Sequence, residues 1–228
     1  MPHFSKDIAK KAAGRAAAEL IESGMIVGLG TGSTAAYFIE YLIERTKHGL
    51  QVSAIATSTR SREQAEKGGI PIVSDREITF VDLTVDGADE IDEEKRMIKG
   101  GGGALLQEKI VASMSQELII IVDESKMVNR LGKAPLPIEI VPFGYASTLY
   151  KLEQLGYRGK LRLNGKEPFM TDNHNYIVDI HIGKLLTNPL EDERAIRQIP
   201  GVVETGLFLG MAGRVIIGYE NGETETWE

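Results

Sequence analysis

Short apolar runs that alternate with stretches of helical periodicity limit the fold of this chain more than any other feature. Residues 25–30, 52–56, 80–85 and 118–122 are such runs, and the last of them reads LIIIV. Strands that are apolar along their whole length are typical of a parallel sheet, because helices then cover both of its faces. The first part of the chain therefore predicts a Rossmann-like α/β domain built on a parallel sheet.

The pattern changes after about residue 132, where Pro135, Pro137 and Pro142 punctuate the chain. Strand and helix signals then follow in the order βαββαβ, which is the ferredoxin-like arrangement. The expected elements are strand 138–141, helix 145–155, strand 160–163, strand 176–182, helix 191–199 and strand 202–209.

One more strand is expected at residues 214–219, and we predict that it returns to the first sheet. This arrangement gives a chain of two parts. The α/β catalytic domain is expected to comprise residues 1–132 and 210–228. A smaller ferredoxin-like α+β domain, residues 133–209, is expected to be inserted near the C-terminus.

Composition excludes several classes of function. The chain has no cysteine, which removes thiol catalysis and cysteine-bound zinc, and none of its four histidines has the spacing of a metal site. The formal net charge is −7, without the basic face that nucleic-acid binding needs. No apolar stretch approaches the roughly 20 residues that cross a bilayer, and the first residues predict a helix, not a signal peptide. We therefore expect a cytoplasmic protein that binds neither nucleic acid nor membrane.

A glycine-rich segment, GLGTGST at residues 28–34, lies between the first expected strand and its helix. Its last four residues, Thr31, Gly32, Ser33 and Thr34, place hydroxyl and backbone N–H groups at a helix N-terminus, which suits a phosphate. A dinucleotide fingerprint is excluded because Ser33 takes the third glycine position, and a P-loop is excluded because the segment has no lysine. A tight turn with a helix cap explains the same residues, so both interpretations stay open.

A second segment, Asp86-Gly87-Ala88-Asp89, follows the strand expected at residues 80–85. Ligands of open α/β sheets bind beyond the carboxyl ends of strands, where two carboxylates can act as acid and base. A solvated acidic turn is the alternative, and the residues alone favour it because more acidic residues follow. A calcium loop is excluded by the spacing.

Two lysines and a glutamate complete the candidate residues. Lys99 precedes four glycines, residues 100–103, which lead directly into an apolar helix. A glycine run in this position indicates that the backbone lies against a ligand. A flexible linker has the same composition and is the alternative. Glu108 lies about one turn into that helix, where most glutamates are simply exposed. Lys126 follows the LIIIV strand and is expected on the same edge of the sheet as Asp86, or in an exposed loop.

Taken together, GLGTGST, DGADEID, KGGGGALLQEK, DESK and LGKAPLPIEIVPF resemble type A ribose-5-phosphate isomerase, in this order and across almost the whole chain. The resemblance implies interconversion of D-ribose 5-phosphate and D-ribulose 5-phosphate in the pentose phosphate pathway. It also implies that no metal or nucleotide cofactor is needed, and that the protein is a homodimer or homotetramer.

The resemblance further implies a role for each candidate residue. Glu108 would be the catalytic base that moves a proton between C2 and C1, and Lys99 would donate to the oxyanion of the ene-diolate. Asp86 would act as acid or base in ring opening, and Asp89 would orient hydroxyl groups or help stabilise the intermediate. The implied substrate-binding residues are Thr31, Gly32, Ser33, Thr34, Asp86, Gly87, Ala88, Asp89, Lys99, Gly100, Gly101, Gly102 and Lys126.

Two other classes of protein have related folds. A sugar-phosphate sensor of a transcription regulator would need a DNA-binding module of roughly 50–60 residues, whereas the α/β pattern here starts close to Met1. An acyl or CoA transferase would use a glutamate as nucleophile, and only the position of Glu108 fits it.

Overall fold

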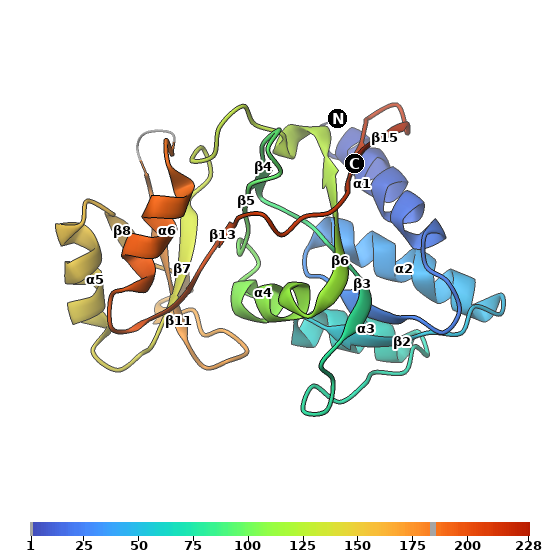
Figure 1. Ribbon diagram of the computed structural model, residues 1–228, viewed down its shortest axis with the longest axis horizontal. Helices are drawn as coiled ribbons and strands as arrows, with labels where there is room; N and C mark the ends of the chain where they lie inside the picture. The colour runs from blue at the N-terminus through green and yellow to red at the C-terminus, as the bar shows by residue number, and fades with distance from the viewer. Residues whose placement is uncertain (1, 183–185) are drawn as a thin grey trace. The chain divides into compact units, whose positions relative to one another are not determined.

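The computed structural model describes residues 2–182 and 186–228, which form two compact units (Figure 1). The first unit comprises Met1–Ala88, Gln107–Met127 and Met211–Glu228, and the second comprises Asp89–Leu106 and Val128–Gly210. The domain boundaries expected from the sequence stay a prediction; the compact units differ from them chiefly because residues 89–106 group with the second unit. Among the described residues, no helix is both long and apolar enough to cross a membrane.

A six-stranded sheet forms the centre of the first unit, in the order β15-β14-β6-β3-β1-β2. All neighbouring strands are parallel except β14 and β15. The strands are β1 (Ile26–Leu29), β2 (Ser53–Ala56), β3 (Val81–Asp86), β6 (Ser115–Asp123), β14 (Val215–Gly218) and β15 (Thr224–Trp227). The Rossmann-like parallel sheet is thus confirmed, and β14 is the strand that was expected to return to it.

Helices cover both faces of this sheet. On one face, Phe38 and Leu42 of α2 share a core with Ile119 and Ile121 of β6. On the other face, Val111 of α4 packs with residues of β2 and β3. The helices are α1 (Pro2–Glu19), α2 (Ser33–Lys47), α3 (Thr59–Lys67) and α4 (Leu105–Ser113), and β6 leads into the 3-10 turn η1 (Glu124–Lys126).

Small residues let α1 approach its neighbours closely. A Cβ on Gly14 would lie 2.8 Å from the backbone nitrogen of Phe38, and one on Gly218 would lie 1.9 Å from the carbonyl oxygen of Ala9. Both distances are shorter than real carbon contacts allow, so a larger side chain at either position would push α1 away from α2 or β14. The alanine-rich sequence of α1 therefore provides helix propensity and close packing together.

An antiparallel four-stranded sheet forms the centre of the second unit, in the order β12-β7-β11-β8. With two helices, its chain order is βαββαβ, so the ferredoxin-like arrangement is confirmed. The elements are β7 (Leu136–Ile140), α5 (Tyr145–Gln154), β8 (Gly159–Leu161), β11 (Tyr176–Ile180), α6 (Pro189–Arg197) and β12 (Val202–Thr205).

The second unit also contains short strands that the sequence did not predict. β4 (Glu90–Ile91) and β5 (Met97–Ile98) form a hairpin, and β13 (Leu207–Phe208) pairs with β5. β9 (Leu163–Asn164) and β10 (Glu167–Pro168) form another hairpin. The three-stranded sheet positions two of the candidate site residues, because Asp89 immediately precedes β4 and Lys99 immediately follows β5.

Candidate active site

The loop between β1 and α2 contains the expected phosphate-binding residues. Gly32, with φ 119°, precedes α2, whose first residue Ser33 is exposed. No side chain caps this helix, so its first N–H groups keep their capacity to bind an anion. Thr34 is buried, and the Thr31 hydroxyl lies 2.8 Å from the hydroxyls of both Thr57 and Ser58. Ser33 is therefore the hydroxyl of this loop that is most accessible to a ligand.

Asp86 ends β3 directly beside this loop. Its Oδ1 accepts hydrogen bonds from the backbone N–H of Thr31 at 3.0 Å and of Gly87 at 2.7 Å. A Cβ on Gly30 would lie 2.2 Å from the same oxygen, so only glycine lets the carboxylate approach the loop. Asp86 is 1% exposed, which contradicts the interpretation of a solvated turn for this residue.

Lys126 lies in the turn that follows β6, the strand next to β3. Its turn is stabilised by Asp123, whose Oδ1 accepts hydrogen bonds from the backbone N–H and the hydroxyl of Ser125. Because β1, β3 and β6 are parallel neighbours, their carboxyl ends share one edge of the sheet. The first unit therefore brings the loop before α2, Asp86 and the turn with Lys126 to the same edge.

Glu108 lies in the first turn of α4 and is 3% exposed, so the alternative of a surface glutamate is wrong. The C-terminal end of α4 lies at the start of β3, because the N–H of Val81 donates to the carbonyl of Met114 at 3.0 Å. One turn further along α4, Val111 packs against the sheet with Ile55 of β2 and Val81 of β3, so Glu108 is buried on the helix that covers this face. A buried carboxylate near a helix N-terminus is favoured by the helix dipole.

The Lys99 loop, residues 99–104, connects β5 to α4. The second unit brings Asp89 and this loop together through the β4–β5 hairpin. The Gly101 N–H donates to Asp89 Oδ2 at 2.7 Å, and the Asp89 N–H donates to the carbonyl of Ile98 at 2.9 Å. Gly100 and Gly103 have φ values of 100° and 84°, a left-handed conformation that favours glycine. The glycine run is thus a fixed turn between β5 and α4, and the linker interpretation is wrong.

Lys99, which precedes these glycines, is fixed by burial, by a ring contact and by a backbone hydrogen bond. Its side chain is 3% exposed, and its ammonium lies 5.3 Å from the ring centre of Phe208 on β13. Its backbone N–H donates to the carbonyl of Gly206 at 2.8 Å. A lysine this deeply buried is rare outside functional sites and ion pairs.

The chain is similar in sequence to a known protein family. The model of the family described as ribose 5-phosphate isomerase A (phosphoriboisomerase A) matches residues 53–222. The ribose-5-phosphate isomerase A of Protochlamydia amoebophila is 53% identical over 218 residues, which are 95% of this chain and 94% of the relative.

The chain belongs to the ribose 5-phosphate isomerase A family. The enzyme of the same name from Bacillus cereus is 50% identical, over 95% of this chain and 98% of that protein. The solved ribose 5-phosphate isomerase from Plasmodium falciparum has a TM-score of 0.94 and 39% identity, and covers 97% of this chain and 98% of its own. The resemblance inferred from the sequence is therefore confirmed.

Another solved relative of this isomerase family is described as a complex with phospho-erythronic acid. It has a TM-score of 0.91 and 38% identity, and covers 96% of this chain and 97% of its own. These values show that the fold extends over both compact units of the isomerase chain.

The sequence did not point to the hydroxyl groups that support the loop before α2 in this isomerase. Thr57 and Ser58 follow β2 and contact Thr31, and the Ser61 hydroxyl donates to the carbonyl of Gly30 at 2.6 Å. The available signal was the run Thr57-Ser58-Thr59 at the carboxyl end of a strand, which is where ligands of such sheets bind.

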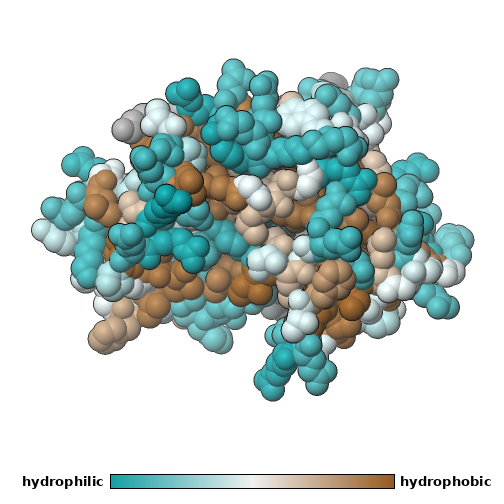
Figure 2. Space-filling model, in the orientation of Figure 1, coloured by the Kyte–Doolittle hydropathy of each residue, from teal (hydrophilic) through white to brown (hydrophobic). Residues whose placement is uncertain are grey.

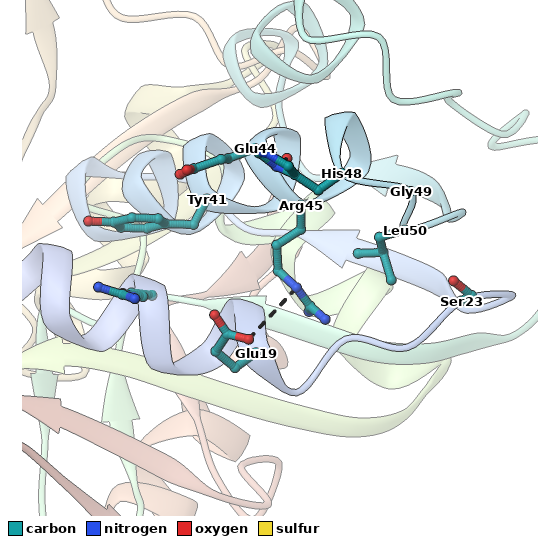
Figure 3. A pocket seen from close by; sticks show the side chains of 9 residues that line it. Glu19, Ser23, Tyr41, Glu44, Arg45, His48, Gly49 and Leu50 are labelled. Carbon is teal, nitrogen blue, oxygen red and sulfur yellow. Dashed lines mark hydrogen bonds and ion pairs between the residues drawn. The ribbon is translucent and has the colours of Figure 1, made fainter.

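A pocket of about 610 Å³ in the first unit contains none of the predicted site residues (Figure 3). It lies where α1 and α2 end, at the amino edge of the sheet. Figure 3 shows Arg45 between the two helices; its Nε lies 3.8 Å from Glu19, and its Nη1 donates to the carbonyl of Ile21 at 2.8 Å. This arginine thus binds the protein itself, and the pocket supports no role in the isomerase reaction.

Proposed function

We propose that this chain interconverts D-ribose 5-phosphate and D-ribulose 5-phosphate through an ene-diolate, with Glu108 as the base, in the non-oxidative pentose phosphate pathway. Family membership supports the reaction. The assignment of the base depends on one observation above all, the burial of Glu108 in the first turn of α4, a helix that packs against the sheet to which Asp86 belongs.

Proton transfer is the central step. The base removes the proton from C2 of the open-chain aldose and returns it to C1. Negative charge develops on the C1 oxygen, which takes up a proton while the C2 hydroxyl gives one up, so that the carbonyl moves from C1 to C2. A carboxylate can take and return the same proton without a cofactor. Burial excludes bulk water, which strengthens the electrostatic interactions of the site and limits loss of the proton. Glu108 meets both requirements.

The remaining residues have roles that their local structure supports. Lys99, a buried cation, would stabilise the oxyanion of the ene-diolate. Asp86 is oriented by two backbone N–H groups and would move the proton during ring opening. Asp89 is oriented by the Gly101 N–H and would fix substrate hydroxyl groups.

Phosphate binding is assigned to Thr31, Gly32, Ser33 and Thr34, with Lys126. An uncapped helix N-terminus, with a lysine at the same edge of the sheet, is suited to bind a dianion. A solved relative is described in complex with phospho-erythronic acid, a phosphorylated sugar acid, which supports a phosphorylated sugar as the class of ligand.

The direct test is conversion of ribose 5-phosphate to ribulose 5-phosphate by the purified chain without any cofactor. We expect activity that survives dialysis against EDTA, since the proposed proton transfers use carboxylates and a lysine only. If activity disappears on EDTA treatment and returns with a divalent cation, the proposed mechanism is wrong. If no activity is found before dialysis, the function itself is wrong.

Substitutions in the phosphate site should separate binding from chemistry. Ser33→Ala and Lys126→Ala are each expected to raise the KM for ribose 5-phosphate by about tenfold, the effect of losing roughly 1.4 kcal/mol of binding, with little change in kcat. Residual activity on unphosphorylated ribose should change much less. Equal losses on both substrates would place the phosphate elsewhere.

We also propose that the chain forms a homodimer or homotetramer and acts in the cytoplasm, where phosphorylated sugars are retained. An apolar patch on the second unit supports self-association: Phe143 is 93% exposed, and Val141, Tyr145 and Met170 are exposed as well. Tyr176 connects the patch, because its ring contacts Tyr145 and its backbone pairs with Met170. Figure 2 shows hydrophobic side chains at the surface over this part of the chain (brown, lower left).

Sedimentation equilibrium distinguishes the homodimer from the homotetramer. A monomer at micromolar concentration would contradict both proposed assemblies.

A further inference from the structure

An arginine of the second unit that the proposed chemistry does not use contacts the Lys99 loop. Arg162 lies between β8 and β9, and its Nε donates to Asp179 Oδ2 at 2.8 Å while Nη2 donates to Oδ1. Asp179 belongs to β11, in the middle of the antiparallel sheet. The side chains are 16% and 23% exposed, so this forked pair holds the guanidinium in one orientation against a rigid strand.

The third nitrogen of the Arg162 guanidinium binds the Lys99 loop. Arg162 Nη1 donates to the carbonyl of Gly100 at 3.0 Å and to the carbonyl of Gly101 at 3.2 Å. The carbonyl of Gly100 and the N–H of Gly101 belong to one planar trans peptide unit and point in opposite directions. That N–H donates to Asp89 Oδ2 at 2.7 Å. A single peptide unit therefore connects Arg162 to the carboxylate of Asp89.

Phe169 fixes the other end of the glycine run. Its ring lies 2.5 Å from the place where a Cβ on Gly103 would be, so it packs directly on that glycine. The Phe169 N–H donates to the carbonyl of Arg162 at 2.8 Å, and the guanidinium carbon lies 5.8 Å from the ring centre. Arg162 thus contacts the loop by hydrogen bonds and also through Phe169.

We infer that Arg162 is a positioning residue for the isomerisation: it holds the Gly100–Gly101 peptide so that its N–H fixes the Asp89 carboxylate. This inference rests on the proposed function, because it takes Asp89 and the Lys99 loop as parts of the substrate site. Arg162 acts through Asp89 and is not itself assigned any contact with substrate. Asp179 serves only to orient the guanidinium.

Arg162→Met tests the inference, because methionine keeps part of the apolar volume and removes every donor. We expect kcat to fall by about 10- to 100-fold, since misplacing a reactive group by about 1 Å costs on this order. The KM for ribose 5-phosphate should change by less than about threefold, because phosphate binding is assigned to the first unit. Arg162→Lys should recover only part of the loss, because lysine lacks the planar fork that binds Asp179 and the loop together.

A double-mutant cycle distinguishes positioning from general loss of structure. If Arg162 acts through Asp89, kcat of the Asp89→Asn/Arg162→Met protein should lie within about threefold of the slower single variant. Arg214→Met is the matched control, because Arg214 forms the same fork with Glu117 in the first unit, at 2.7 and 2.8 Å. It should lower the midpoint of thermal unfolding as Arg162→Met does, but leave kcat within about twofold of wild type.

Three results would overturn the inference. They are an Arg162→Met kcat within threefold of wild type, losses that multiply in the double variant, and an equal loss of kcat in Arg214→Met. Each of these results applies when the wild-type enzyme is active and the Asp89→Asn variant has a lowered kcat. An inactive wild type, or an Asp89→Asn enzyme of normal kcat, would instead count against the proposed function or the role of Asp89.

Discussion

Glu108→Gln is expected to lower kcat by about 10²- to 10⁴-fold, which corresponds to roughly 3–5 kcal/mol of activation barrier. Glutamine keeps the size and hydrogen-bonding capacity of the side chain but cannot accept the C2 proton. The KM for ribose 5-phosphate should change little, because phosphate binding is assigned to the loop before α2. Steady-state kinetics with the purified variant measure both constants.

Glu117→Gln is the control for this variant. Glu117 lies on β6 of the same unit and pairs with Arg214, away from the predicted site residues. Its substitution should lower stability slightly and leave kcat near that of wild type. A folded Glu108→Gln enzyme that retains more than a tenth of the wild-type kcat would end the assignment of Glu108 as base, and Asp86 would be tested next.

Asp86→Asn is the second substitution with a large expected effect, a fall in kcat of about 100-fold. The amide oxygen of asparagine can still accept the N–H groups of Thr31 and Gly87, so the loop should keep its structure while the proton-transfer group is lost. Circular dichroism and thermal unfolding check the fold, and the isomerase assay gives kcat.

Asp82→Asn is the matched control for Asp86→Asn. Asp82 lies on the same strand near its amino end, where Oδ2 accepts the N–H of Ile26 at 2.7 Å. Both substitutions remove one carboxylate that binds backbone, but only Asp86 lies at the edge assigned to the substrate. Similar losses of kcat in the two variants would mean that Asp86 has a structural role only.

Most strands of the six-stranded and four-stranded sheets could be predicted because they leave a local signal. β15 was not predicted, because its four residues, TETW, are mostly exposed and contain no apolar run. β6 contains LIIIV, an apolar run that is recognisable without its partners, and β11 has the buried apolar residues Val178 and Ile180 on either side of Asp179. The order of such signals along the chain was enough to indicate the parallel sheet and the inserted βαββαβ unit.

The small sheet of β4, β5 and β13 could not be predicted in the same way. Each strand has two residues, which is too short to show any period, and β13 follows β5 by more than a hundred residues. Its pairing depends on contacts between distant segments. The sequence therefore did not show that the four glycines after Lys99 form a fixed turn against Asp89.

The site residues show where residue types and spacing stop being informative. A glutamate one turn into a helix is usually exposed, and only the resemblance to a known family indicated otherwise for Glu108. Arg162 contacts Gly100, 62 positions away in the chain, and Gly101, 61 positions away, and no local sequence pattern predicts these contacts. Only the folded chain brings them together.

The most direct test of Glu108 as the base is proton exchange followed by NMR in deuterium oxide. Wild-type enzyme should replace the C2 proton of ribose 5-phosphate with deuterium, because the proton on the base exchanges with solvent in a fraction of turnovers. Glu108→Gln should show exchange slowed by the same factor as kcat, about 10²-fold or more. A folded Glu108→Gln protein that exchanges the C2 proton at the wild-type rate would contradict the account, because another group would then be the base.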